Sequence, residues 1–185
     1  MDSDLPLDKN LLIIGGTGRN VGKTSLALML LKKYKESRII GLKVSAHRKN
    51  EEYFHGSHEF LPVENYKISI ETGNKPWKDT AQMVNAGAIK AFYIESADEK
   101  IPEAYIDFRN NHNNSNLPVI CESRSLRKHI IPGVYILLIS SDNVLQDSEI
   151  AKADLVHYTQ PDSNELLRLA EQIKLTETGW TISKK

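Results

Sequence analysis

Short apolar runs alternate with polar or amphipathic stretches along most of the chain. Residues 10–15 (NLLIIG) form an apolar run that ends in glycine, which is typical of a buried strand. Similar patterns predict further strands at residues 38–44, 67–70, 88–94, 117–122, 133–139, 154–158 and 180–182. Because helical patterns separate many of these strands, the sequence predicts a three-layer α/β fold: a mostly parallel sheet with helices on both faces.

Four segments have the pattern of helices. They are residues 24–35, 79–87, 101–108 and a segment from Asp162 that ends its apolar face at Ile173. The first is apolar on nearly every side, so we expect it to be deeply buried. In the second, Asp79 stands three residues before Gln82, which is the spacing of a capping box, and Gly87 is expected to stop the helix. Trp77, just before it, is expected to serve as a packing anchor.

Size and composition are those of an ordinary globular domain. The chain has 185 residues, of which 40% are hydrophobic and 26% charged, so we expect a single domain over residues 1–185. Lys plus Arg equals Asp plus Glu, 24 against 24, which disfavours nucleic acid as a partner. The N-terminus lacks a signal-peptide pattern, and no apolar run reaches the roughly 20 residues that span a bilayer. With Cys121 as its one cysteine, the chain is expected in the cytoplasm, away from membranes.

The chemistry concentrates in a glycine-rich segment between the first strand and the first helix. Glycines let backbone N–H groups turn toward phosphates, and the helix start adds unpaired amides and a positive dipole end. In such a loop the lysine reaches the β- and γ-phosphates, and the hydroxyl after it binds Mg²⁺. The sequence therefore predicts a site for ATP or GTP, the base being open, formed by Gly16, Thr17, Gly18, Arg19, Asn20, Val21, Gly22, Lys23, Thr24 and Ser25.

A second metal-binding candidate ends the strand at residues 117–122. Glu122 stands where an open α/β sheet places functional groups, at the carboxyl end of a strand. Mg²⁺ typically takes one or two carboxylates together with phosphates. Thr24 and Glu122 are thus the predicted metal ligands, although a strand-end carboxylate can also be an ordinary surface group.

Two families of P-loop proteins resemble this chain over residues 11–95. The loop G-T-x-x-x-V-G-K-T, with Gly41-Leu42-Lys43 on the second strand, is similar to dethiobiotin synthetase, in the signal-recognition, partition-ATPase and biotin-synthesis class. This resemblance implies that Lys43 faces the phosphates or a co-substrate and shares catalysis with Lys23. Val44 stands where that family has a proline.

The second resemblance is to the molybdopterin-guanine dinucleotide biosynthesis adaptor, protein B. It lies in Lys78-Asp79-Thr80, in Ala86-Gly87-Ala88 and in the histidine-containing segment that follows the second strand. The family implies molybdenum cofactor biosynthesis and makes Asp79 and His47 candidates for substrate contact. Gln82-Met83 replaces the Arg-His pair of that family.

Two functions therefore remain open. One is a slow, Mg²⁺-dependent NTPase or adaptor that acts on a partner enzyme, which the second resemblance favours. The other is an ATP-dependent kinase or carboxylate-activating ligase with a small anionic co-substrate. The long polar segment 47–62 and the basic stretch 124–129 are where such a molecule or partner would bind. The sequence does not decide the oligomeric state, and both a monomer and a homodimer remain possible.

Overall fold

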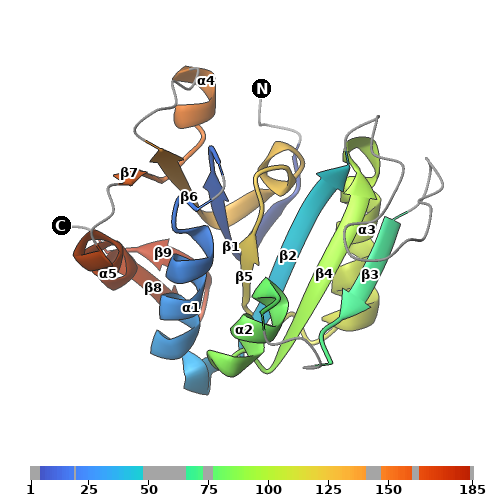
Figure 1. Cartoon of the computed structure of the whole chain (residues 1–185). Helices are drawn as coiled ribbons and strands as arrows, with labels where there is room; N and C mark the ends of the chain where they lie inside the picture. Colours follow the sequence, from blue (N-terminus) through green and yellow to red (C-terminus); the bar gives the residue numbers. More distant parts are fainter. Residues whose placement is uncertain are drawn as a thin grey trace.

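The computed structural model describes residues 5–18, 20–47, 66–72, 77–140, 147–159 and 163–183. Within these ranges seven strands form one sheet in the order β3-β4-β2-β5-β1-β6-β7 (Figure 1). Their bounds are β1 Leu7–Gly16, β2 Ile40–His47, β3 Tyr66–Ile70, β4 Lys90–Ala97, β5 Val119–Glu122, β6 Ile131–Ser140 and β7 Leu155–Thr159. Only the edge pair β3–β4 is antiparallel. The predicted α/β fold with a mostly parallel sheet is confirmed.

Helices cover both faces of the sheet, because apolar side chains alternate between two cores. One core, with Leu12 and Ile14 of β1, packs against α1, α2 and α5. The other, with Leu11 and Ile13, packs against α3 (Figure 1). The helices are α1 Lys23–Lys33, α2 Asp79–Asn85, α3 Ile101–Asp107, α4 Asp147–Ile150 and α5 Ser163–Gln172. Short helical segments follow α1, β4, α3 and β5: η1 Lys35–Ser37, η2 Asp98–Lys100, η3 Phe108–His112 and η4 Leu126–Lys128.

Helix α1 is buried on one side only, which corrects the expectation of burial all round. Leu26, Ala27, Leu30 and Leu31 are buried, whereas Leu28 and Met29 are partly exposed. Trp77 is 72% exposed, so its expected role as a packing anchor is wrong. Cys121 lies fully inside the core, as its apolar strand predicted. In the described part of the chain, no helix is long and apolar enough to cross a bilayer.

The C-terminal segment forms its own hairpin rather than the edge of the main sheet. β8 (Ile173–Thr176) pairs antiparallel with β9 (Gly179–Ile182). Ile173 therefore begins a strand instead of ending the helix face, and its carbonyl accepts hydrogen bonds from Lys33 Nζ at 2.9 Å and Tyr34 Oη at 2.7 Å. These bonds fasten the hairpin to the end of α1.

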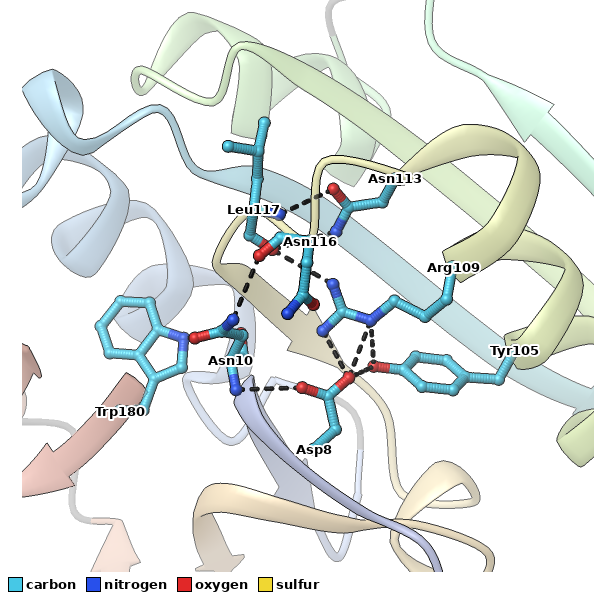
Figure 2. A network of polar contacts seen from close by, with 8 residues as sticks. All are labelled: Asp8, Asn10, Tyr105, Arg109, Asn113, Asn116, Leu117 and Trp180. Atoms are coloured by element: carbon cyan, nitrogen blue, oxygen red, sulfur yellow. Dashed lines mark hydrogen bonds and ion pairs between the residues drawn. The ribbon is translucent and has the colours of Figure 1, made fainter. Parts of the chain in front are cut away.

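A polar network joins several segments at the amino end of the sheet (Figure 2). The Asp8 carboxylate accepts hydrogen bonds from Tyr105 Oη and Arg109 Nε, both at 2.7 Å. Arg109 Nη1 also donates to the Leu117 carbonyl at 3.1 Å, and Trp180 Nε1 donates to the Asn10 carbonyl at 3.1 Å. The start of β1 is thereby tied to α3, to the approach to β5 and to the C-terminal hairpin.

Candidate functional site

A wide cleft lies at the opposite end, where the parallel strands finish. It has a volume of about 1100 Å³ and crosses the carboxyl ends of β1, β5 and β2. Among the residues singled out from sequence, it is lined by Asn20, Gly22, Lys23, Thr24, Ser25, Lys43, Asp79 and Glu122. Residues from four separate segments therefore meet in one cleft, at the carboxyl ends of the strands, where open α/β sheets bind ligands.

The glycine-rich loop, residues 16–24, turns tightly between β1 and α1. A Cβ on Gly16 would lie 2.6 Å from the Val21 side chain, so only glycine allows this approach. Gly22 has φ +89°, a left-handed conformation that favours glycine, and it provides no side chain to cap α1. The first turn of α1 has no acidic side chain either. The amides at this helix start are therefore not capped by a side chain of α1 itself, which leaves them available to an anion.

Lys23 reaches back across this loop. Its Nζ donates a hydrogen bond to the Gly18 carbonyl at 2.6 Å. Partial burial lowers the pKa of Lys23, and the positive charges of Lys43 and Arg124 act in the same direction, while Glu122 opposes them. Three cationic groups are therefore close enough to influence one another electrostatically, an arrangement that favours binding of a multiply charged anion.

Thr24 and Glu122 meet on the floor of the cleft. The Thr24 hydroxyl donates to Glu122 Oε2 at 2.9 Å, although the two residues are 98 positions apart. β5 lies between β1 and β2, so Glu122 is level with Ile14 on one side and with Lys43 on the other. Glu122 is only 8% exposed. A hydroxyl and a buried carboxylate side by side form a pair of hard oxygen donors.

The Asp79 side chain does not cap α2, which corrects the capping-box expectation. Lys78 holds the cap position, with no side-chain cap hydrogen bond, and Gln82 donates to the Trp77 carbonyl. The Asp79 carboxylate instead accepts a hydrogen bond from Lys43 in a part-buried ion pair. This tertiary contact directs Asp79 into the cleft.

Other predicted residues do not line the cleft or lie outside the described ranges. Val21 is buried and packs in the core, and Thr17 serves the backbone by accepting from the Ser140 N–H at 3.0 Å. His47 ends β2, but its side chain is not described. Arg19 and residues 48–62 of the long polar segment lie outside the described residues. Within the ranges that are described, no three His, Cys, Asp or Glu side chains gather as a metal site.

The basic stretch 124–129 divides between cleft and core. Arg124 and Lys128 line the cleft, whereas Arg127 is 7% exposed with its guanidinium 5.9 Å from the Tyr135 ring. Arg124 pairs with Glu149 at 3.2 Å, and Lys128 pairs with Asp98 at 3.0 Å. Sequence reasoning missed Asp98 and Glu149. The strand predicted at residues 88–94 ended before Asp98, whereas β4 continues to Ala97. The short helix α4 that bears Glu149 has no periodic pattern.

Positive and negative side chains balance across the cleft. Lys23, Lys43, Arg124 and Lys128 line it, and so do Asp79, Asp98, Glu122 and Glu149. Three of the cations pair directly with carboxylates. The cleft can therefore accept an anion by exchange of ion-pair partners, without an unbalanced positive field beforehand.

Comparison of this chain with family models, with curated proteins and with solved structures finds no match. A functional assignment therefore depends on the chemistry of the cleft itself.

Proposed function

We propose that this chain is a P-loop protein that binds ATP or GTP with Mg²⁺ through residues 16–25. It acts as a slow NTPase or nucleotide-dependent adaptor in the cytoplasm, in the manner that its resemblance to the molybdopterin-guanine dinucleotide biosynthesis adaptor implies. The observation that carries the proposal is the Thr24–Glu122 hydrogen bond of 2.9 Å beside Lys23 in the cleft at the carboxyl ends of the strands. It joins the hydroxyl and the carboxylate that the sequence had independently assigned to one metal.

The residues present fit Mg²⁺ and a triphosphate. Thr24 and Glu122 offer the hard oxygen donors that Mg²⁺ prefers, with phosphate oxygens and water as its remaining ligands. When bound, the ion neutralises phosphate charge. Lys23 would move its amine from the Gly18 carbonyl to the phosphates, where a charge-assisted hydrogen bond is stronger than one to a neutral carbonyl. The amides at the start of α1 would hold the phosphates in place.

A second candidate is an ATP-dependent kinase or carboxylate-activating ligase. One observation favours it: the cleft continues past Glu122 to Ser45 and Asp98, beyond the glycine-rich loop. An adaptor that only binds nucleotide does not need this additional lined space, whereas an enzyme needs room for a co-substrate next to the phosphates.

The test is calorimetric titration of the wild-type protein and Lys23→Ala with ATP and with GTP, each with Mg²⁺. Loss of the charge-assisted contact is expected to weaken binding by about 2–3 kcal/mol, or roughly 30- to 150-fold. Lys32→Ala is the matched control, because Lys32 lies on the same helix but is exposed to solvent. The wild type also identifies the preferred base.

The comparison of variants decides the assignment. Wild-type affinity in Lys32→Ala with loss in Lys23→Ala supports the proposal. Equal nucleotide affinity in Lys23→Ala and the wild type, or no binding of either nucleotide by the wild type, would overturn it. Far-ultraviolet circular dichroism of both variants checks that the fold is intact.

A further inference from the structure

We propose that the cleft contains a second anion subsite, formed by Arg124 and Lys128 beside the proposed phosphate site, for a small co-substrate that bears an oxyanion (carboxylate or phosphate). The inference rests on the proposed function for the identity of its neighbour, a bound triphosphate. It goes further because it assigns a ligand class to side chains that the nucleotide site does not use.

The first argument is the width of the cleft. Its lining runs from Thr24 in α1 to Asp98 directly after β4, across the ends of four neighbouring strands, β1, β5, β2 and β4. Adjacent strands lie about 4.8 Å apart, so the ends of β1 and β4 are separated by roughly 14 Å across the sheet. The glycine-rich loop occupies only the β1 end. The rest of the cleft, with Ser45 and Lys128, lies beyond it.

The second argument is how the chain fixes these two cations. Leu126 is fully buried, and Ser123 Oγ accepts a hydrogen bond from the Leu126 N–H at 3.1 Å. The Lys128 N–H donates to the Ser125 carbonyl at 3.1 Å. The backbone is therefore anchored, while the Arg124 and Lys128 side chains remain about half exposed, at 50% and 58%. Such side chains can change partners without disturbing the fold.

The third argument concerns the present partners. Arg124 Nη2 donates to both Glu149 oxygens at 3.2 and 3.3 Å, and Lys128 Nζ to both Asp98 oxygens at 3.0 and 3.3 Å. Ion pairs this exposed contribute little to stability. An arginine with a phosphate or carboxylate can form a tighter, bidentate contact. Glu149 and Asp98 thus act as exchangeable counterions.

The experiment titrates inorganic phosphate, and separately malonate, into protein saturated with Mg²⁺ and a non-hydrolysable nucleotide analogue. Arg124→Ala and Lys128→Ala are each expected to weaken binding of the probe about tenfold, the equivalent of one lost charge-assisted hydrogen bond. Glu149→Gln and Asp98→Asn remove the competing counterions, so each is expected to strengthen binding about threefold. Lys174→Ala, on the exposed face of β8, is the charge-matched control and is expected to bind as the wild type does.

The subsite is supported if replacement of the cation in each ion pair weakens probe binding and replacement of its carboxylate strengthens it. If the ion pairs are purely structural, replacement of either partner changes the affinity for the probe in the same direction, and that result would overturn the proposal. So would displacement of the probe by the nucleotide analogue, because Arg124 would then serve the nucleotide's own phosphates. If the wild type binds no nucleotide, the same titrations on the protein alone decide the subsite, and the proposed function fails separately.

Discussion

The two ends of the sheet use the same kinds of polar side chain in different ways. At the amino end, Asp8 and Arg109 form an ion pair of 2.5 Å with side chains only 18% and 13% exposed. Tyr105 completes that network, and burial raises its pKa well above the usual value (Figure 2). At the carboxyl end, the Arg124–Glu149 pair is about half exposed, and within the described part of the chain no further hydrogen bond joins it. The first arrangement is suited to stability and the second to exchange.

Burial explains the difference. Removal of one member of a buried pair leaves the other charge without water or partner, which is costly, whereas an exposed partner is resolvated at once. Charged residues near a ligand must release their partners when the ligand arrives. The amino end also has a hollow, of about 660 Å³, lined by Asp8 and Arg109. Because these side chains are already bonded to one another, the comparison assigns that hollow to structure and the larger cleft to ligand binding.

The largest expected effect is on stability at the amino end. Arg109→Met removes the partner of Asp8 and the donor to the Leu117 carbonyl. We expect a loss of about 2–4 kcal/mol in the free energy of unfolding, measured by urea denaturation. Lys128→Ala, which breaks the exposed pair with Asp98, is expected to cost about 1 kcal/mol or less. Equal losses in the two variants would remove the distinction between the two ends.

The next effect concerns the metal. In Glu122→Gln a neutral amide replaces the carboxylate that accepts from Thr24. A neutral ligand suits a hard cation less well, so we expect the apparent Mg²⁺ affinity of the nucleotide complex to fall about tenfold or more. The measurement is nucleotide binding over a Mg²⁺ series. Glu149→Gln changes the same charge in the same cleft and is expected to retain the wild-type Mg²⁺ dependence. An unchanged Mg²⁺ dependence in Glu122→Gln would exclude Glu122 as a metal-binding group.

A smaller effect is expected for the pair of Lys43 with Asp79. Lys43 is level with Glu122 in the sheet, so its charge lies beside the proposed phosphate site. Lys43→Ala is expected to slow single-turnover hydrolysis about tenfold and to weaken nucleotide binding less, because a charge that meets the transition state acts mainly on rate. Asp79→Asn releases the Lys43 amine and should leave it free for that contact, with turnover kept or raised. Wild-type turnover in Lys43→Ala would remove this lysine from the site.

The sequence predicted the elements that local patterns determine. The apolar run of β1, the glycine turn and the start of α1 all follow from residues 10–26, where strand, turn and helix signals agree. The carboxylate at the end of β5 was also predictable, because an apolar strand that stops at a charged residue indicates the carboxyl end of a buried strand, where open α/β sheets bind ligands.

The contacts that the sequence could not predict are those between residues far apart along the chain. Asp79 matches a capping box locally, yet it bonds Lys43, 36 residues earlier, because β2 brings that amine beside the start of α2. Ile173 fits the apolar period of α5, but bonds from Lys33 and Tyr34 to its carbonyl hold it in β8. Glu149 meets Arg124, 25 residues earlier, in the cleft. In each case a tertiary contact outweighs a local preference.

The smallest expected effect is on the stability contributed by Tyr66. It tests whether burial or the number of hydrogen bonds makes a polar cluster important for stability. Tyr66 Oη donates to Asp107 at 2.9 Å, and Asp107 also accepts from Asn111 at 2.6 Å, but this cluster lies near the surface. Loss of hydration, followed by the hydrogen bond to Asp107, raises the pKa of Tyr66 from 10.0 to about 12. The neutral phenol is therefore favoured by folding. Its contribution to stability is complete below pH 10 and is lost as pH rises from there through about 12.

Tyr66→Phe should remove this alkaline dependence and change stability at neutral pH by about 1 kcal/mol or less, because the pair is only partly buried. Urea unfolding at neutral and alkaline pH measures both quantities, and ultraviolet difference spectra follow the tyrosine titration. Tyr105→Phe is the matched variant, since it removes the same hydroxyl from the buried network of Asp8, and its loss at neutral pH should be clearly larger. If the two variants lose equal stability, the number of hydrogen bonds, and not burial, makes a polar cluster structural in this protein.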